Sequence, residues 1–248
     1  MTYSIIAKDP ETGEIAIAVA SRFFACGALV PYAGRDVAVA SQAFCNPLWG
    51  LEGRMRLANG ESSAEVLADF VARDGGQAIR QAHMIDAGGS IAAHTGADCV
   101  DWSGHRSADG VSVAGNMLAG ASVVEATLAA YVENMDQPLL ERLLRAMEAG
   151  ERAGGDKRGK QAAGLVIHRG EDYPWLDIRA DDHADPLAEL RRLTEVSEER
   201  YTHFAMGLAT TSNFSGLVDR SPIDAAIQQA DAERMENGIP SSSHATEA

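Results

Sequence analysis

Apolar runs separated by glycine, proline and acidic residues predict a chain in which strands and helices alternate. Two apolar runs come first, at 3–7 and 15–20, and the turn residues 9–13 between them predict an antiparallel hairpin. We predict further strands at 37–43, 79–86, 91–94, 111–114, 164–167 and 175–178. A Gly88-Gly89 turn joins two of these runs into a second hairpin.

Helical spacing of apolar positions, together with capping residues, predicts five helices between these strands. Ser62 followed by Glu65 is a capping box, and the apolar face that follows carries Val66 and Phe70. Another helix is expected over 48–58, and a second capping box at Ser122 and Glu125 begins a helix that extends to about Asn134. Two more helices are expected to begin at Asp136, with Pro138 in the first turn, and at Asp185, followed by Pro186. Strands followed by pairs of helices predict two stacked sheets between helical layers.

The fold class is therefore α/β (α+β), with one domain expected over 1–200 and an extension over 201–248. From about Asn237 the sequence has no apolar period, and this tail is expected to be disordered. At 248 residues the chain is long enough to bury a full core. No internal repeat is found.

Charge and cysteine content narrow the function classes. The formal net charge of −15 disfavours binding to nucleic acid or to anionic membranes. No apolar run approaches about 18 residues, and no charged-then-apolar leader is present, so we expect a cytoplasmic protein. The three cysteines are odd in number and lack CxxC spacing, which argues against a disulfide framework or a zinc site. We expect no metal and no cofactor.

Thr2 is the candidate nucleophile. The initiator methionine is removed most readily before a small residue such as Thr, and its removal would leave Thr2 with a hydroxyl and a free α-amine. An α-amine has a pKa of about 7.7–8.0, so it can act as a base near neutrality. Many proteins begin with Met-Thr by chance, so Thr2 by itself does not identify a nucleophile.

Ser21 and Arg22 close the second strand of the first hairpin. Antiparallel pairing brings this end beside the start of the first strand, so both residues are expected near Thr2. Arg22 could shift the protonation of the Thr2 α-amine or bind a substrate carboxylate through two hydrogen bonds. An ion pair at the surface is an equally good explanation for Arg22.

Asn116 lies in the segment Gly115–Gly120, which is expected to join a strand to a helix. Its amide and the neighbouring backbone N–H groups could line an oxyanion hole, or the segment could be a plain glycine turn. Gln42 follows Ser41 at the end of an apolar strand and, with Asn46, could face a pocket or solvent.

The segment Gly154–Gln161 is charged and enters a buried strand. Asp156, Lys157 and Arg158 are candidates for binding a polar or anionic substrate, with a solvated loop as the alternative. The segment is not a P-loop, because Gln161 stands where Ser or Thr is required.

Other polar clusters have simpler explanations. His94 and His105 could act as acids or bases, although hydrogen-bonded structural histidines are commoner. The acidic cluster Asp181–Asp185 invites a metal, but a helix cap explains Asp185 better.

Five collinear motifs resemble the domain-of-unknown-function family 1028. They are MTYSIIAKDPETGEIAIAVASRFFACGALVPYA, VASQAFCNPLWG, AAHTG, GNMLAG and GGDKRGKQAA, within residues 1–200. The resemblance implies an N-terminal nucleophile (Ntn) hydrolase with a four-layer αββα sandwich. A weaker similarity to proteasome β subunits, which begin with a mature Thr, implies similar places for Thr2, Ser21-Arg22 and Gly115-Asn116.

These observations lead us to expect a hydrolase of a small amide, peptide or ureido-type bond. Its catalytic residues would be Thr2, Arg22 and Asn116, and its substrate-binding residues Ser21, Gln42, Asp156, Lys157 and Arg158. We expect a small-molecule substrate and a homodimer, with no nucleic acid or membrane partner. Two alternatives stay open: a non-catalytic ligand-binding protein on the same fold, or a structural subunit of an assembly.

Overall fold

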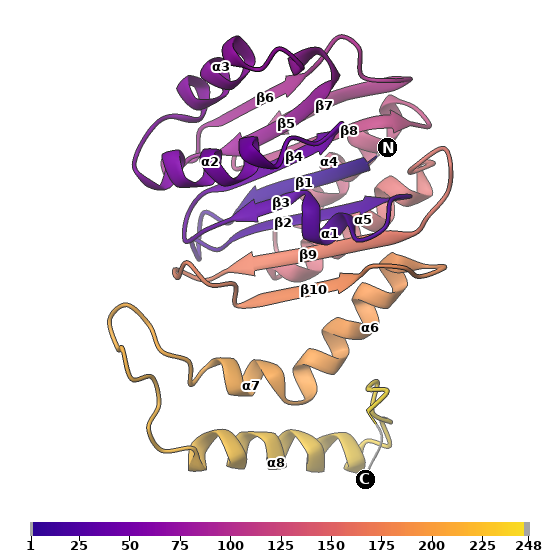
Figure 1. Cartoon of the computed structure of the whole chain (residues 1–248). Coiled ribbons are helices and arrows are strands. Elements are labelled where there is room, and N and C mark those ends of the chain that lie inside the picture. The colour runs from indigo at the N-terminus through magenta and orange to yellow at the C-terminus, as the bar shows by residue number, and fades with distance from the viewer. Residues whose placement is uncertain (1, 246–248) are drawn as a thin grey trace. The chain divides into compact units, whose positions relative to one another are not determined.

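Two antiparallel sheets carry the strands of the described chain, residues 2–245 of a computed structural model (Figure 1). The larger sheet has the order β10 (Leu176–Ala180), β9 (Ala162–His168), β2 (Ile15–Ser21), β1 (Thr2–Lys8), β8 (Val111–Leu118) and β7 (Trp102–Ala108). The smaller has the order β3 (Pro31–Ala33), β4 (Ala38–Ala43), β5 (Arg80–Ile85) and β6 (Ile91–Thr95). All of them lie in the first of two units into which the chain divides, the one that ends at Leu187.

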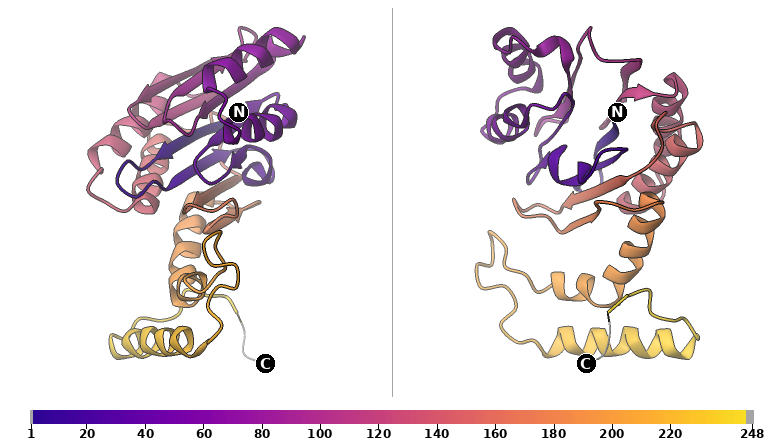
Figure 2. Two further views of the ribbon diagram at one scale, coloured as in Figure 1. Left: turned by 90° about the vertical axis from the view of Figure 1, so that its left-hand side faces the viewer. Right: turned by 45° about the vertical axis from the view of Figure 1, so that its right-hand side comes forward.

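Helices cover the outer faces of the two sheets, which face each other (Figure 2). The larger sheet is covered by α4 (Ala121–Glu133) and α5 (Leu139–Arg152), and the smaller by α2 (Pro47–Ala58) and α3 (Ser63–Arg73). The short α1 (Cys26–Leu29) packs against β2 and β9. Helices and antiparallel sheets in one unit confirm the expected α+β class.

The alternation of side chains along β1 places its two faces in different surroundings. On one face, the Tyr3 hydroxyl donates to the Met147 carbonyl of α5 at 2.8 Å. The other face carries Thr2, Ser4 and Ile6 toward the smaller sheet, where Ile6 belongs to a core cluster with residues of β4 and β5. Both faces of β1 are therefore buried, and the face toward the smaller sheet carries the polar side chains of Thr2 and Ser4.

Gly150 allows α5 to approach β1 closely. A Cβ at this position would lie 2.2 Å from Thr127 Oγ1 and 2.9 Å from Tyr3 Cε2. Any larger residue would therefore push α5 away from α4 and from the strand that begins at Thr2.

Several predicted boundaries need correction. β7 is missing from the sequence-based set of strands, because its residues are half-exposed or exposed and have little apolar period. The capping box at Ser62 is present, but Ser122 and Glu125 do not form one, since α4 starts after Gly120 and Glu125 pairs with Arg106. α5 starts after Pro138 without an Asp136 cap. The segment 115–118 belongs to β8, so it is strand rather than turn.

The second unit begins at Ala188 and is helical. It contains most of α6 (Pro186–Glu199), together with α7 (Tyr201–Ala205) and α8 (Ser221–Glu236). In the tail, the backbone N–H of Ser242 donates to Glu199 at 2.7 Å. Residues 246–248 of the predicted tail lie outside the described residues. Within 2–245, no helix combines the length and apolar character needed to span a membrane.

Candidate active site

Thr2 occupies the first position of β1, between the two strands that flank it. Its Cα partners are Ser21 of β2 and Asn116 of β8, so the predicted adjacency of Thr2 and Ser21 is confirmed. The Oγ atoms of Thr2 and Ser21 lie 3.1 Å apart, and Thr2 is 7% exposed. Met1, whose removal is predicted, lies outside the described residues.

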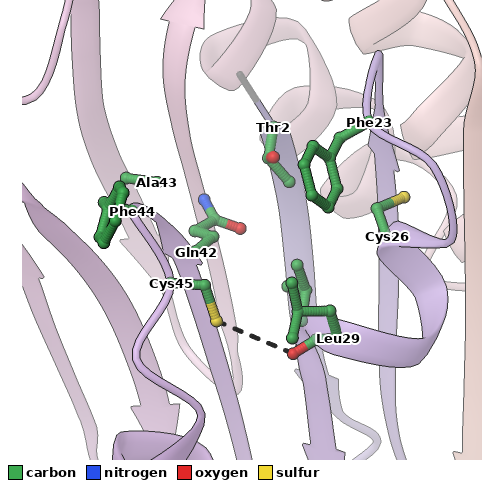
Figure 3. A pocket seen from close by; sticks show the side chains of 9 residues that line it. Thr2, Phe23, Cys26, Leu29, Gln42, Ala43, Phe44 and Cys45 are labelled. Atoms are coloured by element: carbon green, nitrogen blue, oxygen red, sulfur yellow. Dashed lines mark hydrogen bonds between the residues drawn. The ribbon is translucent and has the colours of Figure 1, made fainter.

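A pocket of about 260 Å³ opens beside Thr2 (Figure 3). Its walls come from the segments that follow β2 and β4. The described lining residues are Thr2, Phe23, Cys26, Leu29, Val30, Gln42, Ala43, Phe44 and Cys45. None of these is an acid, a lysine, an arginine or a histidine. The polar side chains of the lining are therefore one hydroxyl, two thiols and one amide.

Backbone strain is concentrated around this pocket. Among residues 2–245, four non-glycine residues have positive φ, and three of them are Ala25 (54°), Ala43 (65°) and Met117 (55°). Ala43 lines the pocket, Ala25 directly precedes the lining residue Cys26, and Met117 follows Asn116. Such conformations cost on the order of 1–3 kcal/mol each and cluster at functional sites. Two of them, Ala25 and Ala43, lie in the segments that form the walls of the pocket.

The two cysteines of the pocket are weak nucleophile candidates. Burial raises the pKa of Cys26 to about 12, and the Asp181 charge adds to this effect. Burial also raises the pKa of Cys45, against hydrogen bonding to Ser41 and the Arg80 charge. Both groups are thiols rather than thiolates at neutral pH, and the thiolate is the reactive form. Thr2 is therefore the nucleophile that the pocket presents best.

Buried amide side chains connect the base of the pocket to the strand beside Thr2. The Gln81 Nε2 donates to the Gly115 carbonyl at 2.8 Å, which fixes the orientation of the Gln81 amide. Gln81 Oε1 then accepts from Gln42 Nε2 at 2.8 Å and from Asn116 Nδ2 at 3.0 Å. Asn116 Nδ2 also lies 3.4 Å from the Thr2 carbonyl. Gln81 thus ties together three strands around the nucleophile.

The same chain of hydrogen bonds continues to His83 and fixes its tautomer. The Ser4 hydroxyl donates to Gln42 Oε1 at 2.7 Å, so it must accept from His83 Nε2 at 2.8 Å. His83 Nδ1 is then the acceptor of the Ser112 hydroxyl at 2.9 Å. Burial, with a smaller contribution from the His105 charge, lowers the pKa of His83 to about 3. His83 is therefore neutral and structural at physiological pH.

Comparison with known proteins identifies the family. The family model described as "Family of unknown function (DUF1028)" matches residues 2–190. The chain belongs to the DUF1028 family. It is also similar to the crystal structure of protein SPO2555 from Silicibacter pomeroyi, which carries the same family description. That similarity has 31% identity and a TM-score of 0.79, and covers 88% of this chain and 99% of the other. No curated protein matched the chain.

Asn116 has a different place in this DUF1028 protein from the one expected. Its amide hydrogens are directed to Gln81 Oε1 and to the Thr2 carbonyl, so they are not free for an oxyanion. The backbone N–H of Met117 donates to Val100 and that of Ala119 to Gly155, each at 3.2 Å. The Asn116 amide and the N–H groups of Met117 and Ala119 are thus used within the fold, and an oxyanion hole from this segment stays a prediction.

Arg22 anchors a loop instead of lining the Thr2 pocket. Its backbone N–H donates to Asp156 Oδ2 at 2.9 Å, and its guanidinium Nη1 donates to the Arg158 carbonyl. The side chain is exposed and lines a separate depression with Lys160 and Gln161. The strand pairing sets Ser21 opposite Thr2 and brings the Arg22 backbone close by. Successive side chains along a strand point to opposite faces, so the Arg22 side chain points away from the one that Ser21 shares with Thr2.

The charged loop is held by ion pairs. Asp156 is 6% exposed and lies 3.2 Å from Arg158 Nη2, and Lys157 Nζ lies 2.5 Å from Asp101. None of the three charged residues is among the described residues that line the Thr2 pocket. Asp156 therefore organises the loop by accepting from the backbone N–H groups of Arg22 and Arg158.

The remaining candidates have structural partners. Asn46 caps α2 by accepting from the Leu48 N–H, and the Ser41 hydroxyl donates to the Asn46 carbonyl. His94 Nε2 lies 2.9 Å from the Gln77 carbonyl and His105 Nδ1 lies 3.1 Å from Thr95 Oγ1. No group of three or more His, Cys, Asp or Glu within residues 2–245 is arranged to hold a metal ion.

Sequence reasoning missed Gln81, Cys45, Phe23 and Phe44. Gln81 carried a weak signal, since it lies with Arg80 and His83 among the polar residues of the predicted strand 79–86. Phe23 and Phe44 follow strand ends and are 55% and 69% exposed, which is unusual for aromatic residues. Aromatic residues directly after predicted strand ends could have indicated the rim of a pocket.

Proposed function

We propose that this protein is an Ntn-type hydrolase that cleaves a small amide, peptide or ureido-type bond with Thr2 as its nucleophile. One observation carries the proposal. Thr2 opens into a pocket whose described lining residues include no carboxylate, lysine or histidine. A base for Thr2 therefore has to come from its own α-amine, freed by removal of Met1, or from water.

The reaction follows from this placement. The Thr2 hydroxyl attacks the substrate carbonyl carbon, and its proton passes to the α-amine, directly or through water. The tetrahedral intermediate then expels the amine product, which takes up that proton, and leaves an ester on Thr2 Oγ1. Water hydrolyses the ester to release the acid. Ser21 orients the attacking oxygen, and Asn116 positions the backbone of Thr2.

The order of layers supports the same assignment. Helices lie outside two facing sheets, and Thr2 begins a central strand of the larger sheet. This is the arrangement expected of the four-layer αββα sandwich of Ntn hydrolases. The pocket of about 260 Å³ is slightly smaller than the range of about 300–1,000 Å³ usual for ligand sites, which favours a small substrate.

Substitution of Thr2 tests the proposal with a panel of small acyl anilides. Thr2→Ala should fold normally and lose turnover, and Thr2→Ser should keep part of it. Thr12→Ala is the matched control, because Thr12 lies in the exposed turn at the far end of the same hairpin. Turnover that survives in Thr2→Ala contradicts the proposal. Binding of a panel member without any turnover would favour a ligand-binding protein.

A further inference from the structure

The pocket beside Thr2 is lined mostly by apolar groups. Phe23, Leu29, Val30, Ala43 and Phe44 contribute hydrocarbon, and the two cysteines are uncharged thiols. A charged ligand group placed there would lose its hydration without gaining an ionic partner among the lining side chains, which is unfavourable. The lining therefore selects for an uncharged group.

The basic residues of the charged loop and of the end of β2 are engaged elsewhere. Lys157 pairs with Asp101 at 2.5 Å, and Arg158 pairs with Asp156 at 3.2 Å. The Arg22 guanidinium donates to the Arg158 carbonyl. These contacts hold the loop against the end of β2 and are separate from the described lining of the pocket.

Gln42 supplies the side-chain amide of the pocket. One N–H of its Nε2 donates to Gln81 Oε1, and its Oε1 accepts from Ser4. The amide nitrogen has a second N–H, and Gln42 lines the pocket together with Thr2 (Figure 3). The Gln42 amide is neutral, so it gives no charge-based preference for a carboxylate.

We propose that this pocket takes a short, uncharged, apolar acyl group. The proposal rests on the hydrolase function proposed for Thr2 and adds the substrate class. A pocket of about 260 Å³ has room for on the order of nine water-sized groups at about 30 Å³ each, which fits a short branched acyl chain. An ester forms between Thr2 Oγ1 and the acyl carbon as the C–N bond breaks, and water then releases the carboxylic acid. Its ionised form is poorly held by the apolar lining, so the product leaves.

Turnover of a matched series of 4-nitroanilides tests the proposal in the intact protein. Isovaleryl-, succinyl- and 4-aminobutyryl-4-nitroanilide have acyl groups of similar length and differ in charge. We expect kcat/KM for the isovaleryl compound to exceed both others by at least about tenfold. Phe23→Ala should reduce this preference, whereas Phe24→Ala should not, because Phe24 is exposed and absent from the described lining.

The outcomes separate this proposal from the hydrolase proposal. Equal or better turnover of a charged compound overturns the substrate class and leaves the hydrolase function intact. If no anilide is turned over, the substrate class is tested by measuring the binding of isovaleramide and of succinamate to Thr2→Ala by calorimetry. Preferential binding of isovaleramide supports the substrate class, although the hydrolase proposal would have failed. Absence of binding, or preference for succinamate, overturns it.

Discussion

The hydroxyl oxygens of Thr2 and Ser21 lie 3.1 Å apart across neighbouring strands, with both residues almost fully buried. Thr2 and Ser21 are directly opposite in the antiparallel register of β1 and β2. The backbone pairing thus fixes the distance between the two hydroxyls, and Ser21 restricts the directions in which Thr2 Oγ1 can point.

Ser21→Ala should lower kcat more than it raises KM. Loss of one neutral hydrogen bond is worth about 1 kcal/mol, which corresponds to roughly fivefold in rate. Steady-state kinetics on a turned-over anilide checks this, with Ser21→Thr expected to retain most of the rate. A loss as complete as that of Thr2→Ala would mean that Ser21 takes part in the chemistry itself.

Gln81→Leu should destabilise the first unit by at least about 2 kcal/mol. The substitution leaves the donors of Gln42 and Asn116 and the Gly115 carbonyl without their partner, and each buried unsatisfied group costs about 1–3 kcal/mol. Urea unfolding followed by tryptophan fluorescence measures it. Gln137→Leu is the control, because the Gln137 side chain donates to the neighbouring Asp136 at the surface rather than to a buried partner. Equal stability of the two variants would rule out Gln81 as the centre of the network.

The sequence predicted those parts of the fold in which local pattern and burial agree. Buried apolar runs gave β1, β2 and β9, and the register of the first hairpin gave the contact between Thr2 and Ser21. β7 was missed because it lies at the edge of the larger sheet and has few buried residues. An edge strand is held by backbone hydrogen bonds, which leave little trace in the side-chain pattern.

The candidate site was harder to predict because its partners come from distant parts of the chain. Gln81 reaches Asn116 only when β5 of one sheet packs over β8 of the other. Lys157 resembled a substrate-binding cation, but its partner Asp101 lies in a loop more than 50 residues earlier. Local sequence shows which residues are charged and cannot show which charges meet in the fold.

His83 should make the first unit less stable in acid. In the unfolded chain a histidine binds a proton below a pKa of about 6.5, whereas in the fold burial lowers the pKa of His83 to about 3. Between these values the unfolded state binds more protons, so stability falls as pH falls. The contribution is roughly 2–3 kcal/mol at pH 4.5 relative to pH 7. In urea unfolding at several pH values, His83→Gln should show a correspondingly shallower loss, and an unchanged slope would contradict this prediction.

Asp9→Asn should cost about 3–5 kcal/mol of unfolding free energy, because it removes one partner of a buried ion pair. Asp9 and Arg142 are 5% and 3% exposed, and their pair joins the turn after β1 to α5. Asparagine keeps the oxygen that accepts from Glu11 and Thr12 in the turn, so the charge is the main change. Glu125→Gln breaks the exposed pair with Arg106 and should change stability by less than about 1 kcal/mol. Similar losses in both variants would contradict the role assigned to Asp9.

The mass of the N-terminal tryptic peptide from active protein quenched during turnover tests the central claim most directly. Cleavage after Lys8 gives a peptide that ends in the first lysine of the chain. We predict that this peptide begins at Thr2 and that a fraction carries the mass of the substrate acyl group, located on Thr2 by fragmentation. A peptide that retains Met1 in protein that turns over substrate, or an acyl group found instead on the Cys45-containing peptide of the same digest, would contradict the account.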